Sequence, residues 1–270
     1  MTFQEDKMVV TFRNPDPFPL EVIVAAQNHA RECYPQESVG VVMADGYVPC
    51  QNVSANPELA FEVDPLETKE LLHRGAILAL VHSHPEGPNY PSLFDQQSQI
   101  ASGMTWGIIP IIGTNDGDEI VPVPSDILWW GDDLPIQPLK CRRFIWGIFH
   151  CWKIVRDWYK LERGIDLPNF AVDYDFIENG ESVFINNVER AGLRDMGKLA
   201  MSDLQIGDVL IGHLKGEHPS HCGVYLGGDD FLHHPPSAPS GIAQLVRWWP
   251  HIDTVFRYDD QICLSLRGIS

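Results

Sequence analysis

The sequence predicts a mixed α/β domain followed by an α+β domain, and three observations support this. The chain has 270 residues, 44% of them hydrophobic, which exceeds the usual length of a single domain. Residues 126–138 hold prolines, paired aspartates and a tryptophan pair between two regions of ordinary globular composition. Helix and strand patterns alternate before this stretch, whereas a helix precedes the strands after it. We therefore expect domains at residues 1–130 and 138–270, joined by a linker at 126–138.

The first region contains four predicted segments before the linker. Residues 18–35 have the apolar spacing of a helix, and residues 38–53 predict two strands around a turn at Asp45-Gly46. A strand is expected from Leu80 to His84, ended by Pro85, and a helix at residues 92–103. This order of helices and strands gives the mixed α/β prediction.

The second region begins with a helix from Cys151 to about Leu161. Short strands are expected at residues 206–212, 221–227 and 231–234. A turn at 227–230 joins the last two, so the helix comes first and an antiparallel sheet follows.

Charge and composition exclude several function classes. The 19 basic and 37 acidic side chains give a net charge of −18, which opposes binding to nucleic acid or anionic lipid. The start of the chain lacks the pattern of a secretory signal, and no apolar run approaches the roughly 18 residues of a membrane span. We expect a soluble protein without membrane insertion. The cysteines form no C-x-x-C pair and are expected to be reduced and mostly buried. They are Cys33, Cys50, Cys141, Cys151, Cys222 and Cys263.

A candidate metal site lies at the end of the strand around residue 82. The period of two in a strand places His82 and His84 on one face, and Asp95 lies in the first turn of the next helix. Two imidazoles and a carboxylate form an open site of the kind that catalytic zinc uses. Glu37, at the start of another strand, could take a proton from the attacking water. Alternatively, Ser92 and Asp95 form only a capping box and the histidines lie on the surface.

The same residues carry a resemblance to the JAMM (MPN-type) metallopeptidases. The motif consists of Glu37, Gly40, His82, His84, Pro85, Ser92 and Asp95 at the spacing of that family. The resemblance implies Zn²⁺ bound by His82, His84 and Asp95, with Glu37 as general acid and base. It also implies that Ser92 stabilises the tetrahedral intermediate.

A candidate nucleophile stands at the start of the helix in the second region. Cys151 would lie in the first turn, where the helix dipole and the free backbone N–H groups lower the pKa of a thiol. Alternatively, Cys151 only fills the core beside Trp152 and Phe149. Strand alternation places Cys222 on the core face and His221 on the other face, toward a site. Either His233 or His234 shares the face of His221, depending on the turn length.

These segments resemble the NlpC-type cysteine peptidases, a papain-like family that commonly cuts peptidoglycan stem peptides. The resemblance implies Cys151 as nucleophile, His221 as base and His233 as the third residue, leaving His234 exposed or anchoring a loop. Two positions depart from the pattern. Many members have aspartate where this chain has His150, and tyrosine where it has Phe144.

The combination of a JAMM-like domain with an NlpC-type domain resembles the tail tip assembly proteins of lambda-like siphophages. This implies synthesis in the host bacterial cytoplasm, delivery at the virion tail tip, and other phage tail tip proteins and bacterial peptidoglycan stem peptides as partners. The hypothesis is a two-domain peptidase that helps tail assembly and cell-wall penetration. The alternatives are a structural assembly factor with non-catalytic domains, and a cytoplasmic isopeptidase acting on a ubiquitin-like partner.

Overall fold

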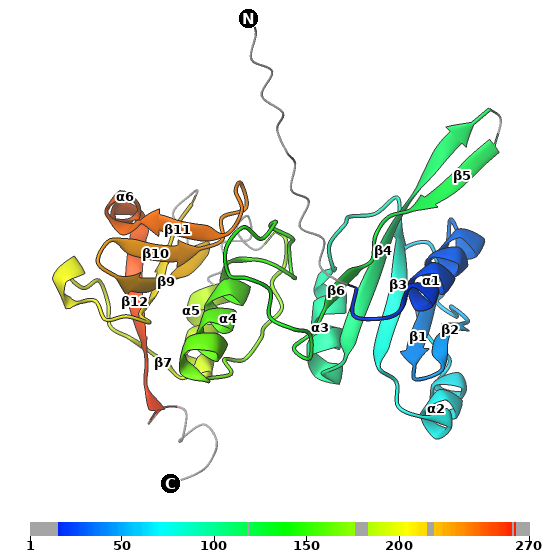
Figure 1. Cartoon of the computed structure of the whole chain (residues 1–270), viewed down its shortest axis with the longest axis horizontal. Helices are drawn as coiled ribbons and strands as arrows, with labels where there is room; N and C mark the ends of the chain where they lie inside the picture. The colour runs from blue at the N-terminus through cyan, green and yellow to red at the C-terminus, as the bar shows by residue number, and fades with distance from the viewer. Residues whose placement is uncertain (1–15, 118, 176–182, 215–218, 261, 263–270) are drawn as a thin grey trace, which may run out of the picture.

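The computed structural model describes residues 16–117, 119–175, 183–214, 219–260 and 262. Two sheets lie side by side, each covered by helices (Figure 1). Within the described ranges, no helix is long and apolar enough to cross a membrane. The architecture is the mixed α/β domain followed by the α+β domain that the sequence predicts. Cys263 lies outside the described residues.

The first sheet has the strand order β2-β1-β3-β4-β5, with β6 beside β4. Its strands are β1 (Val39–Met43), β2 (Gly46–Cys50), β3 (Ala79–Pro85), β4 (Thr105–Asp116), β5 (Glu119–Pro124) and β6 (Leu128–Trp130). The helices are α1 (Leu20–Cys33), α2 (Pro65–Arg74) and α3 (Leu93–Ser102). The predictions of α1, of the β1–β2 hairpin, of β3 and of α3 are confirmed.

Helix α1 determines which face of this sheet is free for chemistry. It starts after Pro19, ends two residues before Pro35, and buries Val22, Ala26 and Ala30 on one face. These side chains pack against the sheet face that carries the odd-numbered residues of β3, such as Val81. Because alternate residues of a strand point to opposite faces, the histidines of β3 lie on the face away from α1.

Strand β6 lies inside the stretch that we expected to be a linker. It pairs antiparallel with β4, with Trp106 opposite Trp130 and Gly107 opposite Trp129. Both tryptophans of β6 are buried, one on each face of the sheet, which stabilises this short strand. The first sheet therefore extends to Trp130, inside the stretch that we expected to be a linker.

The second sheet has the order β11-β10-β9-β8-β12-β7. Its strands are β7 (Leu193–Asp195), β8 (Val209–Gly212), β9 (His221–Gly227), β10 (Asp230–His233), β11 (Gly241–Gln244) and β12 (Ile252–Tyr258). The helices are α4 (Cys151–Arg163), α5 (Val183–Val188) and α6 (Leu245–Trp248), with 3-10 turns at Glu189–Ala191, Met201–Asp203 and Trp249–His251. Helix α4 precedes the antiparallel strands β8, β9 and β10, as predicted.

The largest core of this domain lies between α4 and the sheet. Trp152, Ile154 and Val155 of α4 are buried against β9 residues that include Cys222 and Val224. A second core, containing Leu210 and Tyr225, covers the other face of the sheet. Strand β9 is thus covered on both sides, which explains why it reads as a nearly continuous apolar run.

The two domains share a polar and apolar interface. Gln96 of α3 is buried, accepts a hydrogen bond from the backbone N–H of Val172 at 3.0 Å, and donates to the carbonyl of the same residue at 3.1 Å. Ile148, just before α4, joins a buried cluster with Trp106 and Trp130 of the first sheet. The loop that leads into Cys151 is therefore held in part by the first domain.

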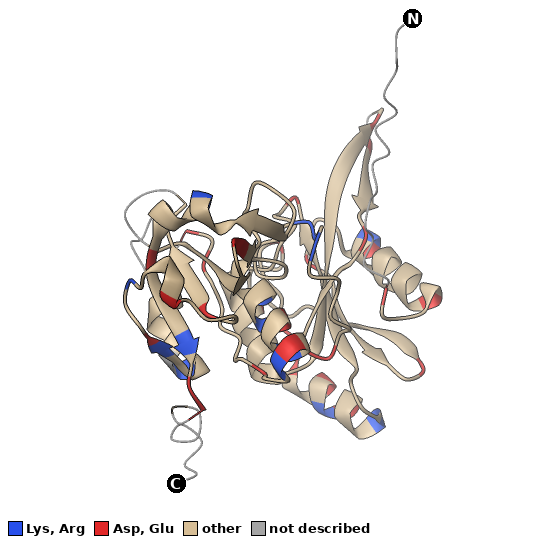
Figure 2. Ribbon diagram, turned by 60° about the vertical axis from the view of Figure 1, so that its left-hand side comes forward, with Lys and Arg blue, Asp and Glu red and all other residues tan. Residues whose placement is uncertain are grey.

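Strands β4 and β5 extend beyond the first sheet as a long hairpin (Figure 1). Figure 2 shows its ribbon almost entirely in the colour of uncharged residues, with acidic residues near its tip. The N–H of Ser125 donates to the carbonyl of Pro110 at 2.7 Å, so odd-numbered residues of β5 direct their backbone groups toward β4. Pro122 and Pro124 therefore face the open edge of the sheet.

Candidate active sites

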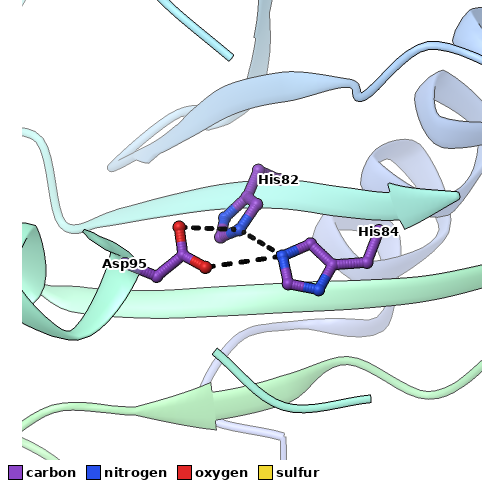
Figure 3. Close-up of side chains that lie close together, drawn as sticks. All are labelled: His82, His84 and Asp95. Atoms are coloured by element: carbon purple, nitrogen blue, oxygen red, sulfur yellow. Dashed lines mark hydrogen bonds and ion pairs between the residues drawn. The ribbon is translucent and has the colours of Figure 1, made fainter. Parts of the chain in front are cut away.

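Three side chains converge on one point at the end of β3 (Figure 3). Nε2 of His82 lies 3.0 Å from Nε2 of His84, and these atoms lie 3.4 and 3.5 Å from the two carboxylate oxygens of Asp95. Ligand atoms about 2.0–2.2 Å from a tetrahedral zinc ion are about 3.3–3.6 Å apart. The spacing and the chemistry of the donors therefore fit an ion of this size. This is the one group of three mutually close metal-ligating side chains in the described part of the chain.

The local fold explains why these residues meet. His82 and His84 share a face of β3, which pairs in parallel with β4, and the loop after Pro85 returns the chain to that face as α3. Ser92 is the N-cap of α3 and Asp95 is its third residue. The carboxylate of Asp95 accepts from the Ser92 backbone N–H at 2.8 Å and from its hydroxyl at 2.7 Å. The capping box thus fixes the metal-facing carboxylate, so capping and a place in the site are compatible.

Hydrogen bonding fixes one histidine ring. Nδ1 of His84 lies 2.9 Å from the carbonyl of Pro88 and donates to it, which leaves Nε2 with a free lone pair toward the site. Nδ1 of His82 is buried and has no hydrogen-bond partner among the described residues. The ring of His82 instead packs against Phe61 and Trp106, with centroids 4.7 and 5.9 Å away.

Burial and hydrogen bonding oppose each other in setting the charges of the three groups. Burial would raise the pKa of Asp95, but hydrogen bonds from the two histidines and from Ser92 hold it well below its usual range. Burial would lower the pKa of His84, but bonds to Asp95 and Pro88 raise it. Burial dominates at His82 and lowers its pKa. A carboxylate that stays ionised beside a neutral imidazole is a suitable ligand pair for a cation.

Glu37 lies beside this group because of the strand register. Val39 of β1 stands opposite His82 of β3, so the antiparallel register carries Glu37 toward His84. The side chain is 8% exposed, and burial raises its pKa to about 7. His84 lowers that pKa and Asp95 raises it, which shows that the three groups interact. Glu37 is therefore suited to carry a proton near neutral pH.

Cys151 is the first residue of α4 and is 6% exposed. Its thiol interacts with Cys222, His150 and His221. Burial would raise the pKa of Cys151, but these contacts outweigh burial and place it well below its ordinary value. A thiolate at the first turn of a helix is a nucleophile.

His221 and His233 continue a row that starts at Cys151. Nε2 of His221 lies 3.0 Å from Nδ1 of His233. Strand pairing places Gly223 opposite His233, and Gly223 points to the same face of β9 as His221. His233 therefore shares the face of His221, which the alternation of residues along the strand could not decide without the turn length. Nδ1 of His221 remains for the thiol. Within the described residues, Cys151 and the two histidines stand in a row and do not surround a common point as metal ligands do.

His234 differs from the sequence-based expectation. We expected it to be exposed or to anchor a loop, but its exposure is 0% and both ring nitrogens lack a hydrogen-bond partner in the described chain. It follows β10 directly and turns its ring edge toward Phe144, with centroids 5.2 Å apart. Burial lowers its pKa to about 4, and Cys151 is near enough to raise it slightly. The expectation of exposure is wrong because the chain after His233 stays packed beneath residues 142–150.

Sequence reasoning missed two further neighbours of the thiol. His150 is the N-cap residue of α4, is 5% exposed, and helps to lower the pKa of Cys151. Cys222 was assigned only a core position, and it does lie in the core, but its thiol also reaches Cys151. The sequence placed Cys222 on the core face and Cys151 at the helix start, but it gave no signal that the two side chains would meet.

Comparison with known proteins supports both domains. The model of the NlpC/P60 family matches residues 141–247, and the model of prokaryotic homologs of the JAB domain matches residues 19–125. The tail tip assembly protein K of Escherichia phage N15 is 30% identical over 220 residues, which cover 79% of this chain and 84% of that protein. The chain belongs to the tail tip assembly protein K family. The protein of the same name from Escherichia phage lambda is 33% identical over 163 residues, 60% of this chain and 72% of that protein.

Family membership agrees with the architecture derived from the residues. The chain is a phage tail tip assembly protein with an N-terminal JAB-like domain and a C-terminal NlpC/P60 domain. A crystal structure of the NlpC/p60 domain of peptidoglycan hydrolase SagA aligns with 44% of this chain and 89% of its own length, at 22% identity and a TM-score of 0.30. That likeness is too low to carry an argument about the site.

Proposed function

We propose that the C-terminal domain is a cysteine endopeptidase that cuts bacterial peptidoglycan stem peptides. The observation that carries the proposal is the row from Cys151 through His221 to His233, with 3.0 Å between the two imidazoles. It is the arrangement of a nucleophile, a base and a residue that orients the base. The NlpC/P60 match and the family of phage tail tip proteins support the wall as substrate.

The geometry supports a two-step hydrolysis. The Cys151 sulfur attacks the amide carbonyl carbon, and the carbonyl π electrons move to the oxygen. At the start of α4 the backbone N–H groups have no intrahelical acceptor and can donate to that oxygen. The oxyanion then collapses and the C–N bond breaks, and His221 gives the proton that it took from Cys151 to the leaving amine while His233 holds its ring. Water then attacks the thioester carbon with His221 as base, and the acid product and the free thiol are released.

The test is digestion of purified stem peptides by the full chain, followed by mass spectrometry of the fragments. Wild-type protein should release one defined pair of products, and Cys151→Ser should release none. Cys141→Ser, which changes an exposed thiol of the same domain, is the matched control and should cut normally. If wild-type protein leaves both stem peptides and whole wall intact, the structural assembly factor becomes the better explanation.

For the N-terminal domain we propose a zinc metallopeptidase. The spacing of the His82, His84 and Asp95 atoms supports the metal, and the raised pKa of Glu37 supports its role as proton carrier. Bound zinc would supply a Lewis acid that polarises the substrate carbonyl. Glu37 would hold the proton of the attacking water and pass it to the leaving amine, and Ser92 would steady Asp95. Metal analysis of protein stripped with a chelator and reloaded with Zn²⁺ should give one ion per chain.

In the infection cycle, we propose that the protein is made in the host cytoplasm, joins other tail tip proteins during assembly, and opens the wall during entry. Family membership supports the tail location. The test is immunodetection of the chain in purified particles. Detection in assembling tails but not in finished particles would limit the protein to assembly and would remove the role in entry.

A further inference from the structure

A second thiol stands against the candidate nucleophile. Cys222 is the second residue of β9 and belongs to the face of that strand that α4 covers. Cys151 lies in the first turn of α4, on the buried side of the helix. The packing of α4 on β9 places both side chains in one buried cluster, where the two thiols interact, and their exposures are 6% for Cys151 and 0% for Cys222.

The two thiols have opposite character. Contacts with Cys222, His150 and His221 outweigh burial and lower the pKa of Cys151, whereas burial and the neighbouring Cys151 raise the pKa of Cys222. Cys222 therefore keeps its proton and donates it toward the Cys151 sulfur. A thiolate reacts with peroxide far faster than a thiol does, so oxidation is directed to one member of the pair.

The contact helps to hold Cys151 as a thiolate, but it supplies neither the base nor the N–H donors of the hydrolysis proposed above. Those come from His221 and from the N-terminus of α4, so a valine at position 222 would leave both in place. A sulfur atom at this position adds one chemical property that valine lacks, namely the ability to form a disulfide with its neighbour.

We propose that Cys222 is a resolving thiol that captures oxidised Cys151 as a reversible disulfide and so protects the nucleophile from permanent loss. This inference rests on Cys151 being the reactive thiol of the proposed function. The oxidant is a hydroperoxide, with hydrogen peroxide as the probe.

The reaction balances in two steps. The Cys151 thiolate attacks one peroxide oxygen, the O–O bond breaks, hydroxide leaves, and Cys151 becomes a sulfenic acid as peroxide is reduced by two electrons. The Cys222 sulfur then attacks the Cys151 sulfur, the S–O bond breaks, and water leaves with the proton of Cys222. Dithiothreitol restores both thiols by two exchange steps. Without Cys222, further peroxide takes the sulfenic acid to the sulfinic acid, which dithiothreitol does not reduce.

The experiment treats the reduced full chain with a small excess of hydrogen peroxide and maps its peptides without reduction. Wild-type protein should yield a peptide pair joined through Cys151 and Cys222. After dithiothreitol, most Cys151 should again react with iodoacetamide. In Cys222→Val, which keeps an apolar side chain in the core but removes the thiol, we expect at least about fivefold less recoverable Cys151 and a matching gain of sulfinic acid. Cys141→Ser is the control and should behave as wild type.

Two outcomes would overturn the proposal. One is sulfinic acid at Cys151 in wild-type protein to the same extent as in Cys222→Val. The other is a disulfide that joins Cys151 to a different cysteine. None of these readouts uses wall cleavage, so a protein that forms the disulfide but cuts no stem peptide would refute the proposed function and leave this inference standing.

Discussion

The candidate metal site and the candidate cysteine site are built from different kinds of chain segment. His82, His84 and Asp95 belong to one continuous strand–loop–helix unit, in which β3 supplies two candidate ligands and α3 the third. Cys151 and His221 stand on α4 and β9, and they meet only because the helix packs on the sheet. The first site gathers its groups around a point, whereas the second arranges them in a row.

This difference teaches where each site is vulnerable. A site on one local unit depends mainly on its own ligands and on the capping of its helix. A site assembled by packing depends also on whatever holds the packed elements, here including the loop with Ile148 that enters the Trp106 and Trp130 cluster of the other domain. Changes of ligand should therefore act on the first site alone, and changes of packing should reach the second.

The largest effect that separates the sites is expected for Cys151→Ser. Removal of the nucleophile should lower stem-peptide cleavage by about 10⁴-fold, as in other enzymes whose catalytic groups act as a unit. Zinc stoichiometry should stay unchanged, because Cys151 is not among the metal-facing groups. Peptide mass spectrometry and metal analysis of the same preparation check both results. Loss of zinc in this variant would show that the two sites are one.

A smaller effect is expected for His84→Ala. Zinc affinity should fall by at least about 100-fold, since changes that only support a ligand already cost 10- to 100-fold. The rate of Cys151 alkylation by iodoacetamide should stay within about twofold of wild type, if the sites are as separate as their construction suggests. His73→Ala, an exposed histidine on α2, is the control. A parallel fall in alkylation would contradict the separation.

Gln96→Ala tests the packing between the domains. The change removes the acceptor of the buried Val172 N–H, at a cost of about 1–3 kcal/mol, while the Val172 carbonyl keeps its bond from the Trp146 indole. We expect calorimetry to show the first unfolding event several degrees lower and the melting curve to separate into two transitions. Gln99→Ala is the matched control, because this neighbouring buried glutamine donates to Met104 inside its own domain. A single, unshifted transition in Gln96→Ala would show that the contact does not join the domains.

The smallest effect concerns pH and His234. Its pKa of about 4 lies below the ordinary 6.5, so between these values the unfolded chain binds a proton that the folded chain does not. Stability is therefore lost as the pH falls through this window. His234→Gln removes that contribution, and the drop in Tm between about pH 7 and about pH 5 should shrink by a few degrees. An equal drop in both proteins would show that another group causes it. His233, with a pKa lowered to about 3, acts in the same direction in both.

The local sequence pattern was sufficient to predict most helices and strands and the grouping of His82, His84 and Asp95. The period of two predicts that His82 and His84 share a face, and the helix start places Asp95 near them, because each relation spans a few residues. It also predicts the core-facing position of Cys222. Pattern could not give the contact between Cys222 and Cys151, because that contact depends on where α4 sits along β9.

The two wrong expectations, a linker at β6 and an exposed His234, have the same physical origin. Trp129 and Trp130 were assigned to a linker because a strand of three residues is too short to show the alternation that predicts a strand. Only pairing with β4 makes this segment a strand. His234 looked exposed because neither its type nor its neighbours indicate the layer of residues 142–150 above it. Both depend on a partner distant in the sequence, so no local rule detects them.

The prolines at the edge of β5 affect whether several copies of this chain, held close together, would aggregate through that edge. Ile112, Ile120 and Val123 leave the hairpin with exposed apolar side chains, which favour aggregation at high local concentration. Pro122 and Pro124 present no N–H at that edge, so a neighbouring chain that adds a strand there finds missing donors at successive outward positions. The hairpin can therefore keep an exposed apolar surface without adding strands from neighbouring chains to form a continuous intermolecular sheet.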